Sequence, residues 1–306
     1  MVAGEFTLNF PTRHNIRYLA TPNINNDYGG YCSAINALGD EISAYDFFYF
    51  INSSVRGPFL PPYIRDNWKD IFRAKLTDDV GLVGSTINIL APGFGFSLSY
   101  KQRHGGNEPF SHVQTMAYAM PRRTLAYLRD AGFYSNVAAL DKWEVIADYE
   151  IRMSQLILRN GWNITAFLPE YGTLDYRKHQ PRINPISTKI SGGDMNFPYC
   201  YFGRSAHPFE VVFVKTNRGI FSEEYLDRLA YSALFAQEAL PDWTDCAFVT
   251  EYLARVKAIA HSEEGVALTA SEIAPEMILS LNETMLRQYP ETRDQLEALL
   301  KRSRQE

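Results

Sequence analysis

The sequence predicts an α/β fold, with a mixed, mostly parallel sheet flanked by helices up to about residue 218 and a helical appendage after it. Two observations predict this fold. Apolar, strand-like runs alternate with amphipathic helical segments through the first part of the chain. From Ser222 onward only helical patterns remain, rich in Ala, Leu, Glu and Arg. We therefore expect an α/β domain at residues 1–218 and a helical region at residues 219–306.

The composition is that of a folded protein. Of 306 residues, 46% are hydrophobic and 14% aromatic, which is too apolar for a disordered chain. A net charge of −5 argues against a general nucleic-acid-binding protein, because phosphate binding needs a basic face. Three scattered cysteines form neither a disulfide framework nor a zinc spacing, and the sequence shows neither a signal peptide nor a run of the ~20 apolar residues that a membrane helix needs. These features predict a cytoplasmic protein with no transmembrane segment, and leave peripheral attachment to a membrane open.

The first predicted elements are two short strands, at residues 6–10 and 15–19, with no helix before them. A turn-rich loop then leads into a helix over Thr21–Leu38. Asn25, Asn26 and Asp27 can hydrogen-bond their own backbone and tolerate unusual dihedral angles. Asp27 also precedes the helix, where a carboxylate complements the helix dipole, so a purely structural role stays open beside a ligand-binding one.

The segment Tyr45–Tyr63 opens as a buried, aromatic strand and ends in a polar tip. Asn52, Ser53 and Ser54 form this tip, and Arg56 follows just before a Gly-Pro turn. Ligands of open α/β folds bind beyond the carboxyl ends of strands. The tip is therefore a candidate ligand site, and an ordinary loop is the alternative.

The middle of the chain continues the alternation of helices and strands. Gly-rich residues 91–110 are expected to be an irregular surface loop. His112 lies in an apolar strand, where a buried structural histidine is the alternative to a functional one. The predicted elements are a helix at Arg65–Leu76, a strand at Val80–Leu90, a strand at His112–Ala119 and a helix from Pro121 to Gly132.

The last part of the α/β region contains a strong helix at Asp148–Gly161. Glu150 lies in its predicted first turn, where the helix dipole favours the ionised carboxylate. A strand at residues 163–171 and a patternless stretch at Gly172–Pro198 follow, and the stretch suggests a functional loop or lid. The remaining predictions are a strand at His207–Lys215 and helices at Ser222–Gln237, Asp245–His261, Ser271–Gln288 and Glu291–Arg302.

Several blocks between about residues 16 and 218 resemble GT-A-type glycosyltransferases, including those related to rhamnan-synthesis enzymes. Asn52-Ser53-Ser54 stands where other GT-A enzymes carry an Asp-x-Asp metal motif. Pro22, Asn23, Asp27 and Gly29 match a block that lines the nucleotide pocket in similar proteins. His112 and Gln114 match a block beside the donor sugar, and His207 to Lys215 matches the block that closes the family's core. Counting eleven residues back from Gly161 reaches Glu150, near where many GT-A enzymes carry an acidic pair.

The resemblance implies a GT-A-like, Rossmann-like fold and a hexosyl- or deoxyhexosyltransferase of polysaccharide biosynthesis. Its substrates would be a nucleotide-sugar donor and a glycan or other hydroxyl acceptor. By comparison with this family, the first strand and helix are missing from the N-terminus. Glu150 would be the general base of an inverting reaction, with His112 as a second catalytic residue. The donor would be bound by Asn23, Asp27, Asn52, Ser53, Ser54, Arg56, Gln114, His207 and Lys215.

The polar tip contains amide and hydroxyl groups but no carboxylate, which makes it a poor site for Mg²⁺ or Mn²⁺. We therefore expect transfer that depends weakly on metal or not at all, and we predict no metal ligands. Arg56 and Lys215 would offset the charge of the departing diphosphate. The leading alternative is a catalytically inactive sugar- or nucleotide-binding module derived from such an enzyme. A hydrolase is disfavoured because no G-x-S-x-G motif is present, and a purely structural protein leaves the polar tip unexplained.

Overall fold

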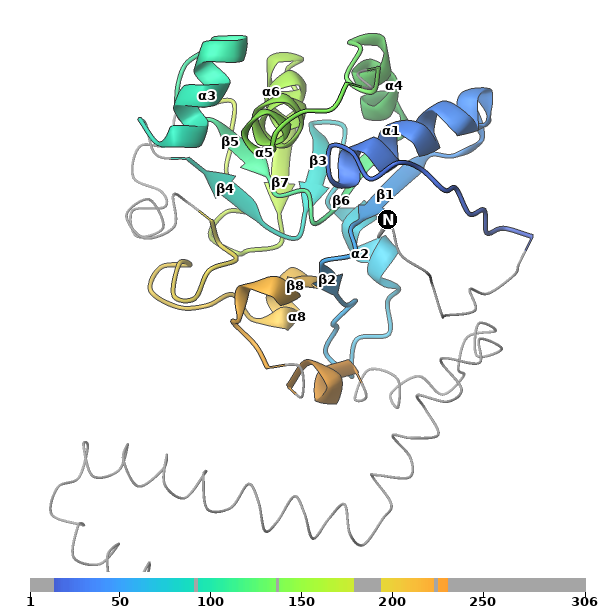
Figure 1. The fold of residues 1–306 in the computed structure, drawn as a ribbon. Helices are drawn as coiled ribbons and strands as arrows, with labels where there is room; N and C mark the ends of the chain where they lie inside the picture. The colour runs from blue at the N-terminus through green and yellow to red at the C-terminus, as the bar shows by residue number, and fades with distance from the viewer. Residues whose placement is uncertain (1–13, 91–92, 136–137, 179–193, 223–224, 231–306) are drawn as a thin grey trace, which may run out of the picture. The chain divides into compact units, whose positions relative to one another are not determined.

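A computed structural model describes residues 14–90, 93–135, 138–178, 194–222 and 225–230 (Figure 1). The chain divides into two units, and all described residues belong to the one that covers His14–Ala239. The strand predicted at residues 6–10 and the helices predicted beyond residue 230 lie outside the described residues. The predicted boundary at residue 218 therefore stays a prediction.

The central sheet confirms a mixed α/β fold. Its four strands follow the order β1-β6-β3-β7. Strand β6 is antiparallel to both of its neighbours, whereas β3 and β7 are parallel. The expectation of mostly parallel pairing is therefore wrong for this sheet. The strands are β1 (Phe47–Ile51), β6 (Ala117–Pro121), β3 (Val80–Gly84) and β7 (Asn163–Ala166).

Two predicted strands are each divided into two. The stretch 80–90 forms β3 and then β4 (Ile87–Ile89), and the stretch 111–121 forms β5 (Ser111–Val113) and then β6. Strands β4 and β5 pair with each other in a separate antiparallel sheet. The two stretches cross closely at Gly84, where an added Cβ would lie 2.3 Å from Cγ1 of Val113. The chain reverses direction between β4 and β5, so β6 runs back along β3 in the antiparallel direction.

Helices cover both faces of the central sheet (Figure 1). One core joins the sheet to α1 (Asp27–Leu38), α4 (Arg122–Asp130) and the helix that contains Ile157. A second core, centred on Phe72 of α2 (Trp68–Ala74), packs against the opposite face. The helix predicted at Arg65–Leu76 is thus shorter, because Asn67 caps it by accepting a hydrogen bond from the Lys69 amide.

Two local predictions are wrong. The stretch 91–110, expected to be irregular, contains helix α3 (Gly95–His104), which buries Tyr100. Residues 15–19 form no strand, and Tyr18 and Leu19 are exposed rather than paired in a sheet.

The helix predicted at Asp148–Gly161 begins earlier and has three parts. They are α5 (Lys142–Val145), a π-helical turn η2 (Ile146–Ile151) and α6 (Arg152–Arg159). Asp141 caps the N-terminus in a reciprocal capping box with Glu144. Glu150 therefore lies inside the helix, and the prediction that it occupies the first turn is wrong.

The prediction of a strand at His207–Lys215 is wrong for most of its length. His207 caps the short helix α8 (Pro208–Val211), in which Pro208 occupies a first-turn position that needs no N–H. Only β8 (Val214–Lys215) is a strand, and it pairs antiparallel with β2 (Val55–Arg56). The remaining short elements are the 3-10 helices η1 (Gly39–Ala44) and η3 (Thr216–Arg218), and residues 225–230 are helical.

No helix within the described ranges has the length and apolar character to cross a membrane.

Candidate functional site

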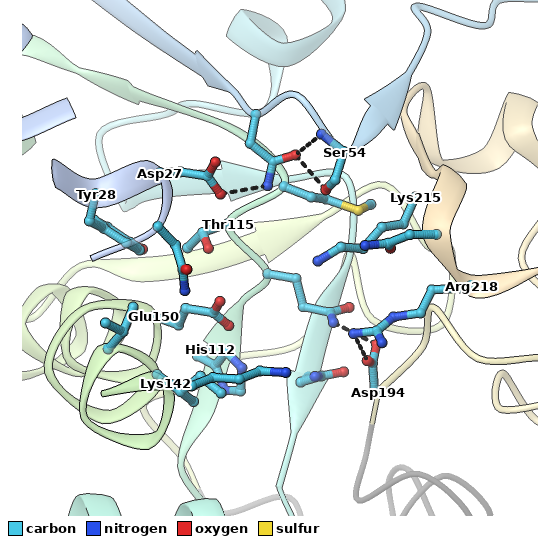
Figure 2. A pocket seen from close by; sticks show the side chains of 18 of the residues that line it. Asp27, Tyr28, Ser54, His112, Thr115, Lys142, Glu150, Asp194, Lys215 and Arg218 are labelled. Carbon is cyan, nitrogen blue, oxygen red and sulfur yellow. Dashed lines mark hydrogen bonds and ion pairs between the residues drawn. The ribbon is translucent and has the colours of Figure 1, made fainter. Parts of the chain in front are cut away.

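A polar cavity of about 710 Å³ lies beyond the carboxyl end of β1 (Figure 2). Its walls come from the start of α1, the tip after β1, strand β5 with the residues that follow it, the α5–η2 helix and residues 194–218. The cavity brings together predicted site residues that are far apart in the sequence. These are Asn23, Asp27, Asn52, Ser53, Ser54, His112, Gln114, Glu150 and Lys215.

The tip after β1 is joined to the first turn of α1. Asn52 donates a hydrogen bond from Nδ2 to Oδ2 of Asp27 at 2.9 Å. Its Oδ1 accepts hydrogen bonds from the backbone N–H and the hydroxyl of Ser54, at 3.0 and 2.8 Å. The loop before α1 takes unusual dihedral angles as predicted, with positive φ at Asn25 and Asn26. The side chains of this wall are therefore held in place by one another.

Gln114 belongs to a chain of hydrogen bonds along another wall. Its Oε1 accepts a bond from the Thr86 hydroxyl at 2.8 Å, and its Nε2 donates to Oδ1 of Asp194 at 2.7 Å. Arg218 donates to the other Asp194 oxygen at 3.3 Å, and its guanidinium lies 4.5 Å from the ring centre of Phe197. Asp194 therefore orients both a neutral amide and a cation at the cavity.

Glu150 points into the cavity from η2 and is half-buried (Figure 2). Burial raises the pKa of its carboxyl group, and the positive charge of Lys215 opposes that shift. The negative charges of Asp194 and Asp27 raise the pKa further, while the Thr115 hydroxyl lowers it. The expectation that a helix N-terminus stabilises the ionised form is wrong, because the helix begins at Lys142. A carboxylate with a raised pKa is a stronger proton acceptor than an ordinary one.

His112 is buried in β5, where it pairs in register with Asn88 of β4. Burial lowers the pKa of its imidazole to about 4, although the Phe110 carbonyl and the charge of Asp194 act in the opposite direction. Nδ1 lies 3.3 Å from the Phe110 carbonyl oxygen, so the neutral ring donates there and keeps Nε2 as an acceptor. This state suits His112 to a hydrogen bond with a ligand hydroxyl.

Arg56 and Lys215 were the two cations predicted to offset the diphosphate charge, and of these Lys215 lines the cavity. The Thr216 amide and hydroxyl bind the Ser54 carbonyl oxygen at 2.9 and 3.0 Å, which holds the end of β8 against the tip. Within the described part of the chain no carboxylate forms an ion pair with Lys215. Figure 2 shows Lys215 and Glu150 pointing into the cavity from opposite sides.

Arg56 and His207 do not line this cavity. Arg56 forms an ion pair with Asp227. Nδ1 of His207 accepts a hydrogen bond from the Phe209 amide, and its Nε2 lies 3.0 Å from the Tyr225 hydroxyl. Both side chains thus contact residues 225–227, and their predicted role in donor binding stays a prediction.

Sequence reasoning missed three charged residues of the cavity, namely Lys142, Asp194 and Arg218. Lys142 belongs to a segment whose helical start was not recognised. Asp194 lies in the stretch Gly172–Pro198, for which a functional loop or lid is predicted without any particular residue. Arg218 follows β8 and carried no motif of its own.

No group of three or more His, Cys, Asp or Glu side chains placed to hold a metal ion occurs among the residues that the structure describes. Taken together, the cavity is lined by the carboxylates Asp27, Glu150 and Asp194 and by the cations Lys142, Lys215 and Arg218. Neutral amides and hydroxyls lie between them. Such a lining can bind a ligand that combines hydroxyl groups with an anionic group. In comparisons with known proteins, no family model, no curated protein and no solved structure matches this chain.

Proposed function

We propose that this protein is a glycosyltransferase that moves a sugar from a nucleotide-sugar donor to a glycan or other hydroxyl acceptor. One observation carries the proposal: across one polar cavity, a carboxylate with a raised pKa faces a cation, Lys215, that has no ion-pair partner among the described residues. Proton removal and the neutralisation of a leaving diphosphate need these two groups. The mixed α/β fold is compatible with this function but does not carry it.

Glu150 has the role of general base in this proposal. Its carboxylate takes the proton from the acceptor hydroxyl, whose oxygen then attacks the anomeric carbon of the donor sugar. The bond from that carbon to the diphosphate oxygen breaks, and the nucleoside diphosphate leaves with the electron pair. A single displacement of this kind inverts the anomeric configuration.

The leaving diphosphate would be neutralised by Lys215 and Arg218. Lys215 is held beside the tip by the pairing of β8 with β2, and Asp194 orients Arg218. A phosphate group would find two positive charges there together with the amide and hydroxyls of Asn52–Ser54. These neutral groups favour a reaction with weak metal dependence, because Mg²⁺ and Mn²⁺ prefer charged oxygen ligands.

The rest of the donor would occupy the other walls. Asn23 and Asp27 stand near the start of α1, where they would contact the base and ribose. His112 and Gln114 would form hydrogen bonds with sugar hydroxyls. Both side chains line the cavity and are held by their own hydrogen-bond partners.

The proposal is tested with a panel of nucleotide sugars that differ in base and sugar. Nucleoside diphosphate release is measured with and without simple glycoside acceptors, and in the presence of a chelator or of Mg²⁺ and Mn²⁺. Nucleoside diphosphate affinity is measured in parallel for the wild type and Lys215→Met. Losing one charge-assisted contact should weaken binding by about tenfold or more. Lys69→Met is the matched control, because Lys69 is exposed on α2.

We expect the control to bind like the wild type and one donor to be turned over. Equal affinity in the wild type and Lys215→Met, or no nucleotide binding at all, would overturn the proposal. Tight binding without turnover of any donor would instead favour the inactive binding module.

A further inference from the structure

An aromatic surface lies beside the cavity, where α3 and α5 begin. Phe96 lines the cavity, and the ring of Trp143 lies 4.5 Å from it at an interplanar angle of 45°. Phe94 adds an edge-to-face contact with Phe96 at 5.5 Å. Trp143 is nevertheless 52% exposed, which is unusual for the largest apolar side chain.

The exposed indole of Trp143 is held in a fixed position. An added Cβ at Gly95 would lie 3.2 Å from Cζ3 of Trp143 and 3.3 Å from Cη2, so the backbone there is in contact with the ring. The helix that carries Trp143 is fixed by the capping box at its first turn. Because Gly95 and Phe96 support one part of the ring, the remainder offers a rigid apolar surface to solvent.

This surface continues into the cavity on the side away from the Asn52–Ser54 tip. Lys142 and Ile146, from the same helix as Trp143, line the cavity. Figure 2 shows Ser54 and Lys142 at opposite ends, with Glu150 between them. A molecule lying on Trp143 would therefore approach Glu150 from the end opposite the proposed diphosphate position.

We propose that Phe96 and Trp143 form a subsite for a pyranose ring of the acceptor, which would make the acceptor a glycan. A pyranose ring presents a face of C–H groups and a rim of hydroxyls. The C–H face can stack on the indole, which removes apolar surface of both groups from water. The Lys142 ammonium can donate hydrogen bonds to the hydroxyls of the rim. This assignment rests on the proposed function, because it takes Glu150 as the group that receives the acceptor proton.

The test is an NMR titration of the full chain with methyl α- and β-glycosides of hexoses and 6-deoxyhexoses. The indole N–H signal of Trp143 is assigned by its loss in Trp143→Phe. We expect at least one glycoside to shift this signal, and Trp143→Ala to weaken that glycoside's binding by about tenfold or more. Trp143→Phe keeps an aromatic face and should lose less. Tyr63→Ala is the control, because Tyr63 is 79% exposed and does not line the cavity.

Nucleoside diphosphate affinity is measured on the same variants and should not change in any of them. The proposal is overturned if no glycoside shifts the Trp143 signal, or if Trp143→Ala binds glycosides like the wild type. A loss of nucleoside diphosphate affinity in Trp143→Ala also overturns it, because the base would then stack on this surface. Glycoside binding at Trp143 without any nucleotide binding supports the glycan subsite and counts against the transferase.

Discussion

Two carboxylates on the same π-helical turn, Asp148 and Glu150, have opposite surroundings. Asp148 accepts hydrogen bonds from Arg103 at 2.8 and 2.5 Å, and its Oδ1 lies 2.6 Å from Nε2 of His104. Glu150 faces the large cavity and the charge of Lys215 across it. Residues two apart on a helix point to different sides, so one helix serves a structural cluster and a candidate site.

The surroundings shift the two pKa values in opposite directions. Burial alone would raise the pKa of Asp148, but the hydrogen bonds from Arg103 and His104 outweigh it and lower that pKa. Burial raises the pKa of Glu150, and Lys215 only partly offsets the shift. The paired carboxylate is therefore held as a permanent charge, whereas the other is prepared to take up a proton.

The largest expected effect is on turnover. Glu150→Gln keeps the size of the side chain and part of its hydrogen bonding but removes the proton acceptor, so the transfer rate should fall by about 10²- to 10⁴-fold. Nucleoside diphosphate affinity should stay near that of the wild type. Asp148→Asn, the matched variant on the same turn, should keep its turnover within a few-fold. Near-normal turnover in Glu150→Gln would rule out the base and favour the binding module.

The next effect is on stability. Asp148→Asn removes one of the two carboxylates that pair with Arg103, the other being Glu144. It should lower the free energy of unfolding by about 1–2 kcal/mol, a few degrees in Tm. Because the folded pKa of Asp148 is lowered, its stabilisation is present above the unfolded value of about 3.9 and lost as pH falls through the folded pKa. Thermal melts from neutral to acid pH should show the two Tm curves converging.

Asp70→Asn is the control for this stability effect. Asp70 pairs with Arg73 on the surface of α2, where both side chains are about half exposed. Exposed pairs of this kind contribute little to stability. If Asp70→Asn lowered the free energy of unfolding as much as Asp148→Asn, the claim that the Asp148 cluster contributes more to stability than an exposed ion pair would be contradicted.

The smallest expected effect is a gain in stability when Glu150 is replaced. A carboxyl group whose folded pKa is raised destabilises the fold once pH exceeds its unfolded value of about 4.3, because the ionised form is disfavoured. Glu150→Gln should therefore raise Tm slightly at neutral pH, by about 1–2 °C. The difference should vanish below pH ~4, where the carboxyl group is protonated in both states. A Tm that falls at neutral pH would mean that the Glu150 charge stabilises the fold.

Local sequence patterns were sufficient to predict the parts of the site that depend on neighbouring residues. Asp27 begins a helix after two strained asparagines, and Asn52 ends a strand, because turn and strand preferences act over a few positions. Glu150 was selected by its spacing from Gly161. The helical pattern, however, placed the helix start at Asp148 instead of Lys142, and so wrongly put Glu150 in a first turn whose dipole would favour the ionised form.

Long-range contacts decide what the sequence could not predict. Gln114 binds Asp194 across 80 positions, and Arg56 pairs with Asp227 across 171. The antiparallel direction of β6 likewise depends on its pairing with strands that are distant in the sequence. Nothing in a short window of sequence marks such partners. The general fold class was therefore predictable, but the wall of the cavity that contains Gln114, Asp194 and Arg218 was not.

The two sides of the helix also allow the most direct test of the central claim. A second, smaller cavity of about 390 Å³ lies on the Asp148 side of the helix. It also contains cations, since its lining consists of Arg103, His104, Asp148, Tyr149 and Arg152. A crystal structure with a bound nucleoside diphosphate would show which cavity is used. We predict the diphosphate beside Lys215 and Arg218, with its terminal phosphate directed toward the space in front of Glu150. A nucleotide bound at Arg103 and Arg152, or one whose terminal phosphate points away from Glu150, would contradict the proposed function.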